Sequence, residues 1–251
     1  MVRAGRAAAG GGADGMAVTS KSTATDMVTE FDTASERLIV AGVRAQRPDD
    51  SIVGEEGTST TGTTGVSWLI DPIDGTTNFL YGLAGYAVSI AATGPQGTLA
   101  AAVYLPATDE LFTATIGGGA FLNGSPIRCS ATTTLAAALV GTGFSYQPAR
   151  RTAQAQRVAA LIADVRDIRR LGAAAADLCY VACGRLDAYF EEHLGPWDLA
   201  AGELIAREAG CRTGALDGGP VHPGSVLAAP PALFEPLRAR LARADDELAN
   251  R

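Results

Sequence analysis

The run Asp71–Phe79, Asp-Pro-Ile-Asp-Gly-Thr-Thr-Asn-Phe, gathers more groups that could do chemistry than any other stretch of this chain. Asp71 and Asp74 stand three residues apart, and the pair Glu55 and Glu56 precedes them by about 15 residues. Oxygen ligands gathered this closely are what a hard divalent cation requires. The run therefore favours a metal-dependent enzyme, and the alternative is a turn that an aspartate merely caps.

The residues that follow Asp74 indicate a phosphate site. Gly75 permits a left-handed or otherwise strained backbone. Thr76 and Thr77 can then open a helical turn whose first N–H groups are unpaired, and such a helix start binds phosphate. One short segment thus predicts metal ligands on one side and a phosphate cradle on the other.

Other acidic residues stand at the ends of expected elements. Glu55 follows the expected strand 51–53, and the carboxyl end of a strand is a favoured place for a site in an α/β fold. Asp198 falls in the first turn of an expected helix, where the macrodipole favours an anion, so it is either a ligand or a simple cap. Glu191 and Glu192 end a short strand, whose alternation points one inward and the other outward.

Hydrophobic periodicity predicts the elements that position these groups. A helix over residues 33–46 should stop at Pro48, residues 58–65 should form a loop, and Asn123-Gly124 should form a hairpin turn. Pro72 should end its strand, because proline cannot donate a ladder hydrogen bond. The expected strands of this part are 51–53, 68–70, 86–93, 99–105, 110–116 and 137–142.

Before residue 149 the expected elements are mostly strands, whereas from residue 149 onward helices and strands alternate. This contrast predicts two α/β or α+β halves that pack as one compact unit. We expect a flexible lead-in over 1–20, an α+β half over 21–145 with most metal ligands, and an α/β half over 146–251 with Asp198 and the substrate contacts. The elements are helices 149–163, 173–183, 196–209 and 232–243 and strands 165–170, 187–191 and 225–229.

The amino-acid composition argues against nucleic acid as the main binding partner. The 251 residues are 47% hydrophobic, and the formal net charge is -7, the opposite sign to a typical polyanion-binding surface. The cluster Arg166, Arg169 and Arg170 is interpreted as a solvated face or a carboxylate partner. Arg170 also leads into the alanine run 173–176, a second free helix start that could approach a ligand.

Nothing in the sequence indicates zinc or a membrane. The histidines, His193 and His222, lack zinc spacing, and no apolar run approaches the roughly 20 residues of a membrane span. Without an apolar signal segment near the N-terminus, we expect a cytoplasmic protein with reduced thiols. These thiols belong to Cys129, Cys179, Cys183 and Cys211.

Taken together, the motifs resemble the inositol monophosphatase family of magnesium-dependent, lithium-sensitive phosphatases, in its bacterial inositol-1-monophosphatase type. The resemblance implies a layered αβαβα sandwich, a homodimer, and hydrolysis of myo-inositol monophosphate to inositol and phosphate by a metal-activated water. The Asp71–Phe79 and Trp197–Gly202 motifs together are highly specific, whereas Gly54–Glu56 alone is weak. The segments that carry the likeness are 21–32, 54–56, 68–79 and 197–202.

The resemblance also implies a metal centre of two or three Mg²⁺ ions. Glu55, Asp71 and the carbonyl of Ile73 would hold one ion. Asp71, Asp74 and Asp198 would hold a second, and Glu55 would help with a looser third.

Catalytic and substrate residues follow from the same resemblance. Asp32 and Thr76 would orient the attacking water, and Glu55 and Asp74 would complete the catalytic set. Lys21 would lie on a mobile loop nearby. The implied substrate contacts are Gly75, Thr76, Asp74, Gly172, Ala173, Ala174, Ala175, Glu191 and Asp198.

Two features depart from the family pattern, and several functions stay open. Only about 20 Gly-rich residues precede Lys21, where the family has a long helix, and Ala173 stands where Ser or Thr is common. Sister phosphatases act on histidinol phosphate, fructose 1,6-bisphosphate or a phosphoadenosine nucleotide, and Glu191 favours a polyol among these. A non-catalytic interaction protein that binds a transcription or ribosome-associated factor is a further hypothesis. A Ca²⁺-binding domain is not supported, because the chain lacks a D-x-D-x-D-G loop.

Overall fold

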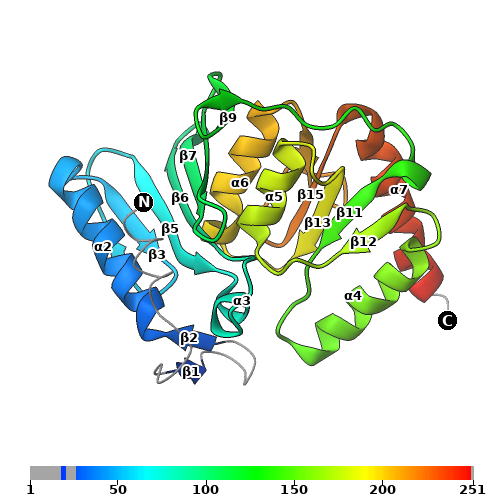
Figure 1. Ribbon diagram of the computed structural model, residues 1–251, viewed down its shortest axis with the longest axis horizontal. Helices are drawn as coiled ribbons and strands as arrows, with labels where there is room; N and C mark the ends of the chain where they lie inside the picture. The colour runs from blue at the N-terminus through cyan, green and yellow to red at the C-terminus, as the bar shows by residue number, and fades with distance from the viewer. Residues whose placement is uncertain (1–17, 21–26, 250–251) are drawn as a thin grey trace.

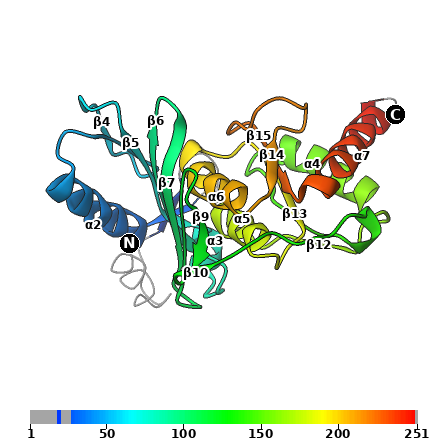
Figure 2. The same ribbon diagram turned by 90° about the horizontal axis from the view of Figure 1, so that it is seen from above.

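Layers of helices and sheets alternate along the long axis of the molecule (Figures 1 and 2). The computed structural model describes residues 18–20 and 27–249. Helix α2 (Glu30–Gln46) covers the outer face of a first sheet, and α5 (Ala174–Ala182) and α6 (Pro196–Glu208) lie between this sheet and a second one. Helices α4 (Pro148–Leu161) and α7 (Pro231–Ala249) cover the far face of the second sheet. The expected αβαβα arrangement is therefore confirmed.

The first sheet has eight strands in the order β10-β9-β8-β7-β6-β5-β3-β4. Only β3 and β5 pair in parallel, and the remaining neighbours are antiparallel. The predicted turn at Asn123-Gly124 joins β9 to β10, with φ 49° and 80° at these two residues. The strands are β3 (Ser51–Gly54), β4 (Ser59–Thr60), β5 (Ser67–Asp74), β6 (Ala87–Gly94), β7 (Gly97–Leu105), β8 (Glu110–Thr115), β9 (Gly119–Leu122) and β10 (Ser125–Pro126).

Strand β5 was expected to end at Pro72. Instead it continues through a bulge as far as Asp74. Asp71 lies opposite Ser89 and Asp74 lies opposite Ala87, so β5 carries one more residue than β6 over this stretch. A bulge leaves its extra residue outside the ladder, and the missing N–H of proline therefore costs no ladder bond there. Both aspartates thus stay on the same strand.

The second sheet has five strands in the order β12-β11-β13-β15-β14. Strand β11 pairs in parallel with both neighbours, whereas β15 is antiparallel to both of its own. Since β11 already belongs to this sheet, the chain changes sheets between Pro126 and Leu139; the division near residue 145 stays a prediction. The strands are β11 (Leu139–Thr142), β12 (Asp167–Arg169), β13 (Ala188–Glu192), β14 (Arg212–Gly214) and β15 (Ser225–Ala229).

The remaining differences from the expected elements are short strands and shifted ends; α7, for example, continues to Ala249 instead of ending at residue 243. Strand β4 lies in the expected loop 58–65, and the three-residue strands β1 (Val18–Ser20), β2 (Met27–Thr29) and β14 were not expected. A 3₁₀ turn (Leu135–Ala137) precedes β11. Segments this short carry too few residues for a periodic signal.

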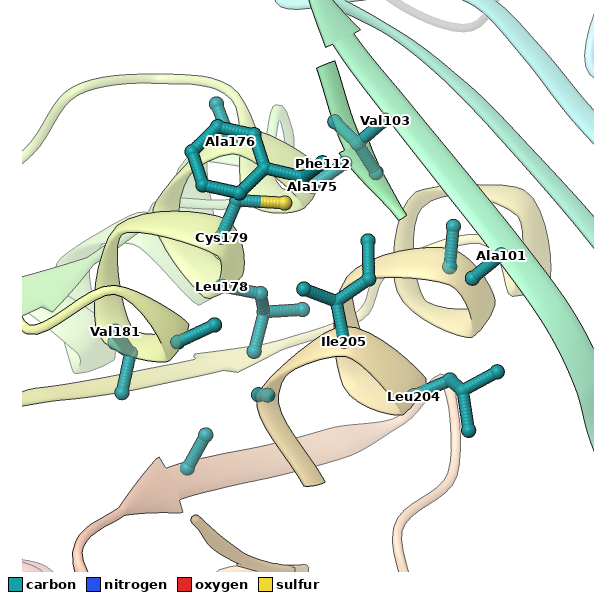
Figure 3. Packing of buried hydrophobic residues seen from close by; sticks show 14 of the residues in the cluster. Ala101, Val103, Phe112, Ala175, Ala176, Leu178, Cys179, Val181, Leu204 and Ile205 are labelled. Carbon is teal, nitrogen blue, oxygen red and sulfur yellow. The ribbon is translucent and has the colours of Figure 1, made fainter. Parts of the chain in front are cut away.

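Helices α5 and α6 approach closely because Gly202 of α6 has no side chain where it meets α5. A Cβ added at Gly202 would lie 2.8 Å from Cβ of Leu178 and 3.3 Å from the carbonyl oxygen of Ala175. Figure 3 shows Leu178 and Ile205 between the two helices, with Phe112 of the first sheet beside α5. This buried layer fixes α6, whose first turn carries Asp198.

Candidate active site

Three carboxylates from distant parts of the chain converge beside the end of β5. Glu55, Asp71 and Asp198 each place one oxygen so that all three lie within 4.8 Å of one another. They come from the turn after β3, from β5 and from the first turn of α6, and Asp71 is only 2% exposed. The structure therefore brings together three of the residues that the sequence predicted as metal ligands.

The position of Glu55 depends on Glu36 of α2, which the sequence analysis did not identify. The Glu36 carboxylate accepts hydrogen bonds from N–H of Glu56 at 2.8 Å and from N–H of Thr58 at 3.1 Å. It also lies so close to Gly54 that a side chain there would collide with it. Glu36 thus ties the turn that carries Glu55 to α2, and its partners are about 20 residues away, where no local motif could reveal them.

The electrostatics of this cluster fit a bound cation. The pKa of Asp71 is well above its usual range, first because of burial and then because of the charges of Glu55, Asp74 and Asp198. Carboxylates that repel one another in a buried site are stabilised by a multivalent cation, and an all-oxygen donor set suits a hard one. Within the described residues this is the one group of acidic, His or Cys side chains close enough to hold a metal ion.

Asp74 is held by the start of α5 and lies outside that group of three. Its carboxylate accepts hydrogen bonds from N–H of Ala174 at 3.2 Å and from N–H of Ala175 at 2.7 Å. Burial and then the charge of Asp198 raise its pKa well above the usual range, and the bond from Ala175 opposes this shift. The expectation that α5 begins with free amides is therefore wrong: Asp74 occupies two of them.

The turn after Asp74 has the geometry that its sequence predicted. Gly75 has φ 88°, and a Cβ on it would lie 2.9 Å from the carbonyl oxygen of Gly85. The short helix α3 (Thr76–Leu80) follows without a side-chain cap. Oγ1 of Thr76 lies 3.1 Å from the carbonyl oxygen of Ile73 and 3.2 Å from Oδ1 of Asp32, and its single proton can serve only one of them.

Asp32 is fully buried behind Thr76 and does not line the cavity. Thr29 caps α2 and donates to Oδ2 of Asp32 from its N–H at 2.8 Å and from its hydroxyl at 2.5 Å. This capping box starts α2 three residues before the expected residue 33. Thr29, which sequence reasoning missed, thus orients the carboxylate that orients Thr76.

Asp198 caps α6 and also lies in the carboxylate cluster. Its Oδ2 accepts a hydrogen bond from N–H of Gly195 at 2.7 Å, so it caps α6, and its carboxylate also belongs to the cluster with Asp71. Ser89 of β6 donates to the carbonyl oxygen of Trp197 at 2.9 Å and ties this helix start to the first sheet.

These groups line a cavity of about 290 Å³ between the two sheets. Ala173 and Ala175 are buried beneath its wall, and Lys21 lies outside the described residues. The loop 143–147, Arg150, Arg170 and His193 also line it, and the sequence analysis had not placed them there. The predicted residues that do line it are Glu55, Asp71, Ile73, Asp74, Gly75, Thr76, Gly172, Ala174, Glu191 and Asp198.

Glu191 faces the cavity and Glu192 faces away, as strand alternation predicted. Glu192 pairs with Arg157 of α4 at 2.5 Å. The Tyr189 hydroxyl donates to Glu191, whose carboxylate packs on Gly143 so tightly that any side chain at 143 would collide with it. Burial raises the pKa of Glu191 to about 7, against the opposing effects of Tyr189 and Arg170.

Comparison with known proteins identifies a consistent set of relatives. The model of the inositol monophosphatase family matches residues 3–246. An inositol-1-monophosphatase of Mycobacterium leprae is 47% identical over 93% of this chain and 84% of its own length. A Nus factor SuhB of Escherichia coli is 42% identical over 92% of this chain and 87% of its own length.

Solved structures show the same likeness. The extragenic suppressor protein suhB from Bartonella henselae has a TM-score of 0.91 and 35% identity, and the match covers 96% of this chain and 94% of that one. A Thermotoga maritima IMPase also has a TM-score of 0.91, with 30% identity over 98% of this chain and 95% of that one.

Two further observations concern the described residues alone. None of their helices is long and apolar enough to cross a bilayer. The four cysteines form no disulfide with one another.

Proposed function

The chain belongs to the inositol monophosphatase family and is a phosphatase, and we propose that it hydrolyses myo-inositol monophosphate to inositol and inorganic phosphate with the help of Mg²⁺. One observation carries the proposal. The carboxylates of Glu55, Asp71 and Asp198 converge beside the Gly75 turn. A cation site next to a helix start is the arrangement that a phosphate monoester requires.

The acidic cluster supplies the ligands of the proposed metal centre. Glu55, Asp71 and Asp198 would hold Mg²⁺, with Asp74 and the carbonyl of Ile73 completing the set for two or three ions. When bound, Mg²⁺ supplies Lewis acidity to the phosphate and to the attacking water. The raised pKa of Asp71 supports this assignment, because a cation removes the repulsion that causes part of it.

Thr76 would orient the attacking water. Its proton points to Asp32 or to the carbonyl of Ile73, which leaves a lone pair that can accept a hydrogen bond from water in the cavity. Glu55 would accept the proton that the water loses. N–H groups of Gly75 and Thr76 would donate to the phosphate and hold phosphorus in line with that water.

The polyol would occupy the part of the cavity beyond the phosphate. Glu191 would accept hydrogen bonds from ring hydroxyls, and Tyr189 and Gly143 fix its carboxylate for that role. Gly172 and Ala174 line the same part of the wall. Ala173 is buried and offers no hydroxyl, so the ring would be recognised without a contact at that position.

Phosphate release tests this function. Purified protein should release phosphate from myo-inositol 1-phosphate with Mg²⁺ and should lose this activity in chelator. Histidinol phosphate, fructose 1,6-bisphosphate and a phosphoadenosine nucleotide should be poorer substrates under the same conditions, because they lack the inositol ring that Glu191 would recognise. Faster hydrolysis of any of these three would replace inositol phosphate as the substrate, and no release from any ester would refute the enzymatic assignment.

Three narrower properties are proposed on the family likeness alone. They are inhibition by Li⁺, assembly into a homodimer and residence in the cytoplasm. Activity with added LiCl, light scattering of the purified protein and cell fractionation test them separately.

Relatives named Nus factor SuhB favour one second candidate, a role in transcription through a protein partner. Capture of partners from cell lysate tests it, with Asp198→Asn as a comparison that impairs the metal site. A transcription factor retained equally by both proteins would support an interaction role that does not depend on the metal site.

A further inference from the structure

The cavity has an acidic inner part and a cationic outer part. Arg170, just after β12, and Arg150, in the first turn of α4, both line it and are exposed at its mouth. The proposed function uses the carboxylates and the Gly75 turn and assigns no role to either arginine.

The Arg170 guanidinium lies close over the backbone of Gly172. Gly172 has φ 95°, and a Cβ added there would lie 2.5 Å from Nη1 of Arg170. The Asn78 side chain of α3 donates to the carbonyl oxygen of Leu171 at 2.7 Å and holds this segment against the turn that follows Asp74. The backbone that carries Arg170 is therefore held beside the proposed phosphate position.

Arg170 differs from the two arginines with which the sequence grouped it. Nε of Arg166 donates to the carbonyl oxygen of Ala137 at 2.9 Å, and Arg169 pairs with Asp167 at 2.6 Å. Across residues 18–20 and 27–249, neither Arg150 nor Arg170 forms a hydrogen bond or an ion pair. The interpretation as a solvated face or a carboxylate partner therefore fits Arg166 and Arg169. It fits Arg170 in part, because Arg170 is exposed and its charge opposes the raised pKa of Asp177 and of Glu191.

The buried carboxyl groups near Arg170 compensate its charge only in part. Burial raises the pKa of Asp177 well above the usual range, and its Oδ1 has no hydrogen-bond partner among the described residues. Burial likewise raises the pKa of Glu191, whose carboxylate accepts its bond from Tyr189. Groups held towards their neutral form compensate a guanidinium only in part.

We propose that Arg150 and Arg170 form a second anion subsite, which favours, among inositol esters, those that carry a second anionic group such as another phosphate. The inference rests on the proposed function, because the scissile phosphate would lie at the carboxylates and the second group at the arginines. Arginine suits this task because its planar guanidinium can donate two hydrogen bonds to one phosphate. In a chain of net charge -7, the two cations also offset the repulsion that a more negative substrate meets at the mouth.

Matched inositol esters test the subsite. The kcat/KM for myo-inositol 1-phosphate is compared with that for bisphosphates with the second phosphate on carbon 3, 4 or 5, at fixed free Mg²⁺. The best bisphosphate should exceed the monophosphate by about tenfold, the size of one charge-assisted hydrogen bond. Arg170→Gln should remove most of this preference and Arg150→Gln part of it.

Two controls separate charge from structure. Arg151 is exposed on the same helix turn as Arg150 but does not line the cavity, so Arg151→Gln should leave the preference unchanged. Arg170→Lys should restore part of it. The KM for the bisphosphate should also rise more steeply with NaCl in the unmodified protein than in Arg150→Gln, because salt screens the attraction.

The outcomes distinguish the two proposals. Equal kcat/KM for all esters, or a bisphosphate preference that survives in both Arg170→Gln and Arg150→Gln, would overturn the subsite and leave the phosphatase proposal standing. No phosphate release from any inositol ester would instead overturn the proposed function. Unchanged thermal midpoints of the variants would show that a lost preference does not come from unfolding.

Discussion

Asp50 and Asp71 are both buried, but the charges around them are opposite. Asp50 precedes β3 and accepts from Nε of Arg47 at 2.8 Å, from the Thr64 hydroxyl at 2.5 Å and from Nε1 of Trp68 at 2.9 Å. The hydrogen bond from Arg47, followed by those from Thr64 and Trp68, lowers the Asp50 pKa to about 2. Asp71 instead faces other carboxylates, and its pKa is raised.

The comparison distinguishes a carboxylate that stabilises the folded state by itself from carboxylates that would need a bound cation to do so. A carboxylate surrounded by donors stabilises the native state as an anion. A carboxylate surrounded by other carboxylates destabilises it until a cation arrives. Repulsion between carboxylates thus destabilises the folded state at the cavity, whereas no such repulsion acts on Asp50.

The strongest test of this contrast is Asp71→Asn. Loss of a carboxylate from the cation site should lower phosphate release on the order of a thousandfold, since metal catalysis contributes several kcal/mol. In chelator the same variant should unfold at a higher temperature than the wild type, by about 2–4 °C for each kcal/mol of relieved repulsion. Activity assays and thermal scans check both expectations, and an activity loss with a lower midpoint would contradict the assigned repulsion.

Adding Mg²⁺ should produce the next largest effect. At about 100 times the dissociation constant a ligand stabilises by about 2.7 kcal/mol, which corresponds to roughly 5–10 °C in a chain of this size. Differential scanning fluorimetry with and without Mg²⁺ measures the shift. Asp50→Asn should keep the shift and Asp198→Asn should lose most of it; equal shifts in both would remove Asp198 from the cation site.

Opposite pH dependences should distinguish the two regions. The folded pKa of Asp50 is about 2, below the ordinary value of 3.8, so its contribution is present above about pH 4 and is lost as the pH falls towards 2. The folded pKa of Glu191 is about 7, above the ordinary 4.5, so its contribution is present below pH 4.5 and is lost as the pH rises through 7.

Denaturant unfolding of the metal-free protein across this range measures both effects. In a plot of the free energy of unfolding against pH, Asp50→Asn should reduce the slope only below about pH 4. Glu191→Gln should reduce the slope only between pH 4.5 and 7. If either variant changed the slope in the pH range assigned to the other residue, the assignment of its carboxyl group would be contradicted.

The smallest effect concerns the backbone at the cavity. His193 lines it with φ 66°, a left-handed conformation that is strained for most residues other than glycine. His193→Gly should raise the thermal midpoint by about 2–4 °C, which corresponds to roughly 1 kcal/mol of strain. Ser145 also lines the cavity but has no positive φ, so Ser145→Gly offers no such gain. An unchanged midpoint in His193→Gly would show that the cavity stores no strain there.

Local signals explain what the sequence could predict. The turn at Gly75, the helix start at Asp198 and the hairpin at Asn123-Gly124 each depend on neighbouring residues, so their motifs were visible in the chain. The catalytic roles depended on the family likeness, and they stay predictions.

The supporting contacts could not be predicted in this way. Glu36 reaches the turn after β3 from another element, and Gly143 matters only because Glu191 packs on it from a parallel strand. Arg170 shares its charge run with Arg166 and Arg169, and only the tertiary structure separates it from them. Pairings between distant segments leave no periodic trace in a single sequence.

The extra residue in β5 lets one strand supply two carboxylates to the same cavity. In a regular strand, residues three apart point to opposite faces, whereas the irregularity between Asp71 and Asp74 leaves both lining the same cavity. Deletion of one residue here would restore the regular alternation and turn one of the two side chains away from the cavity.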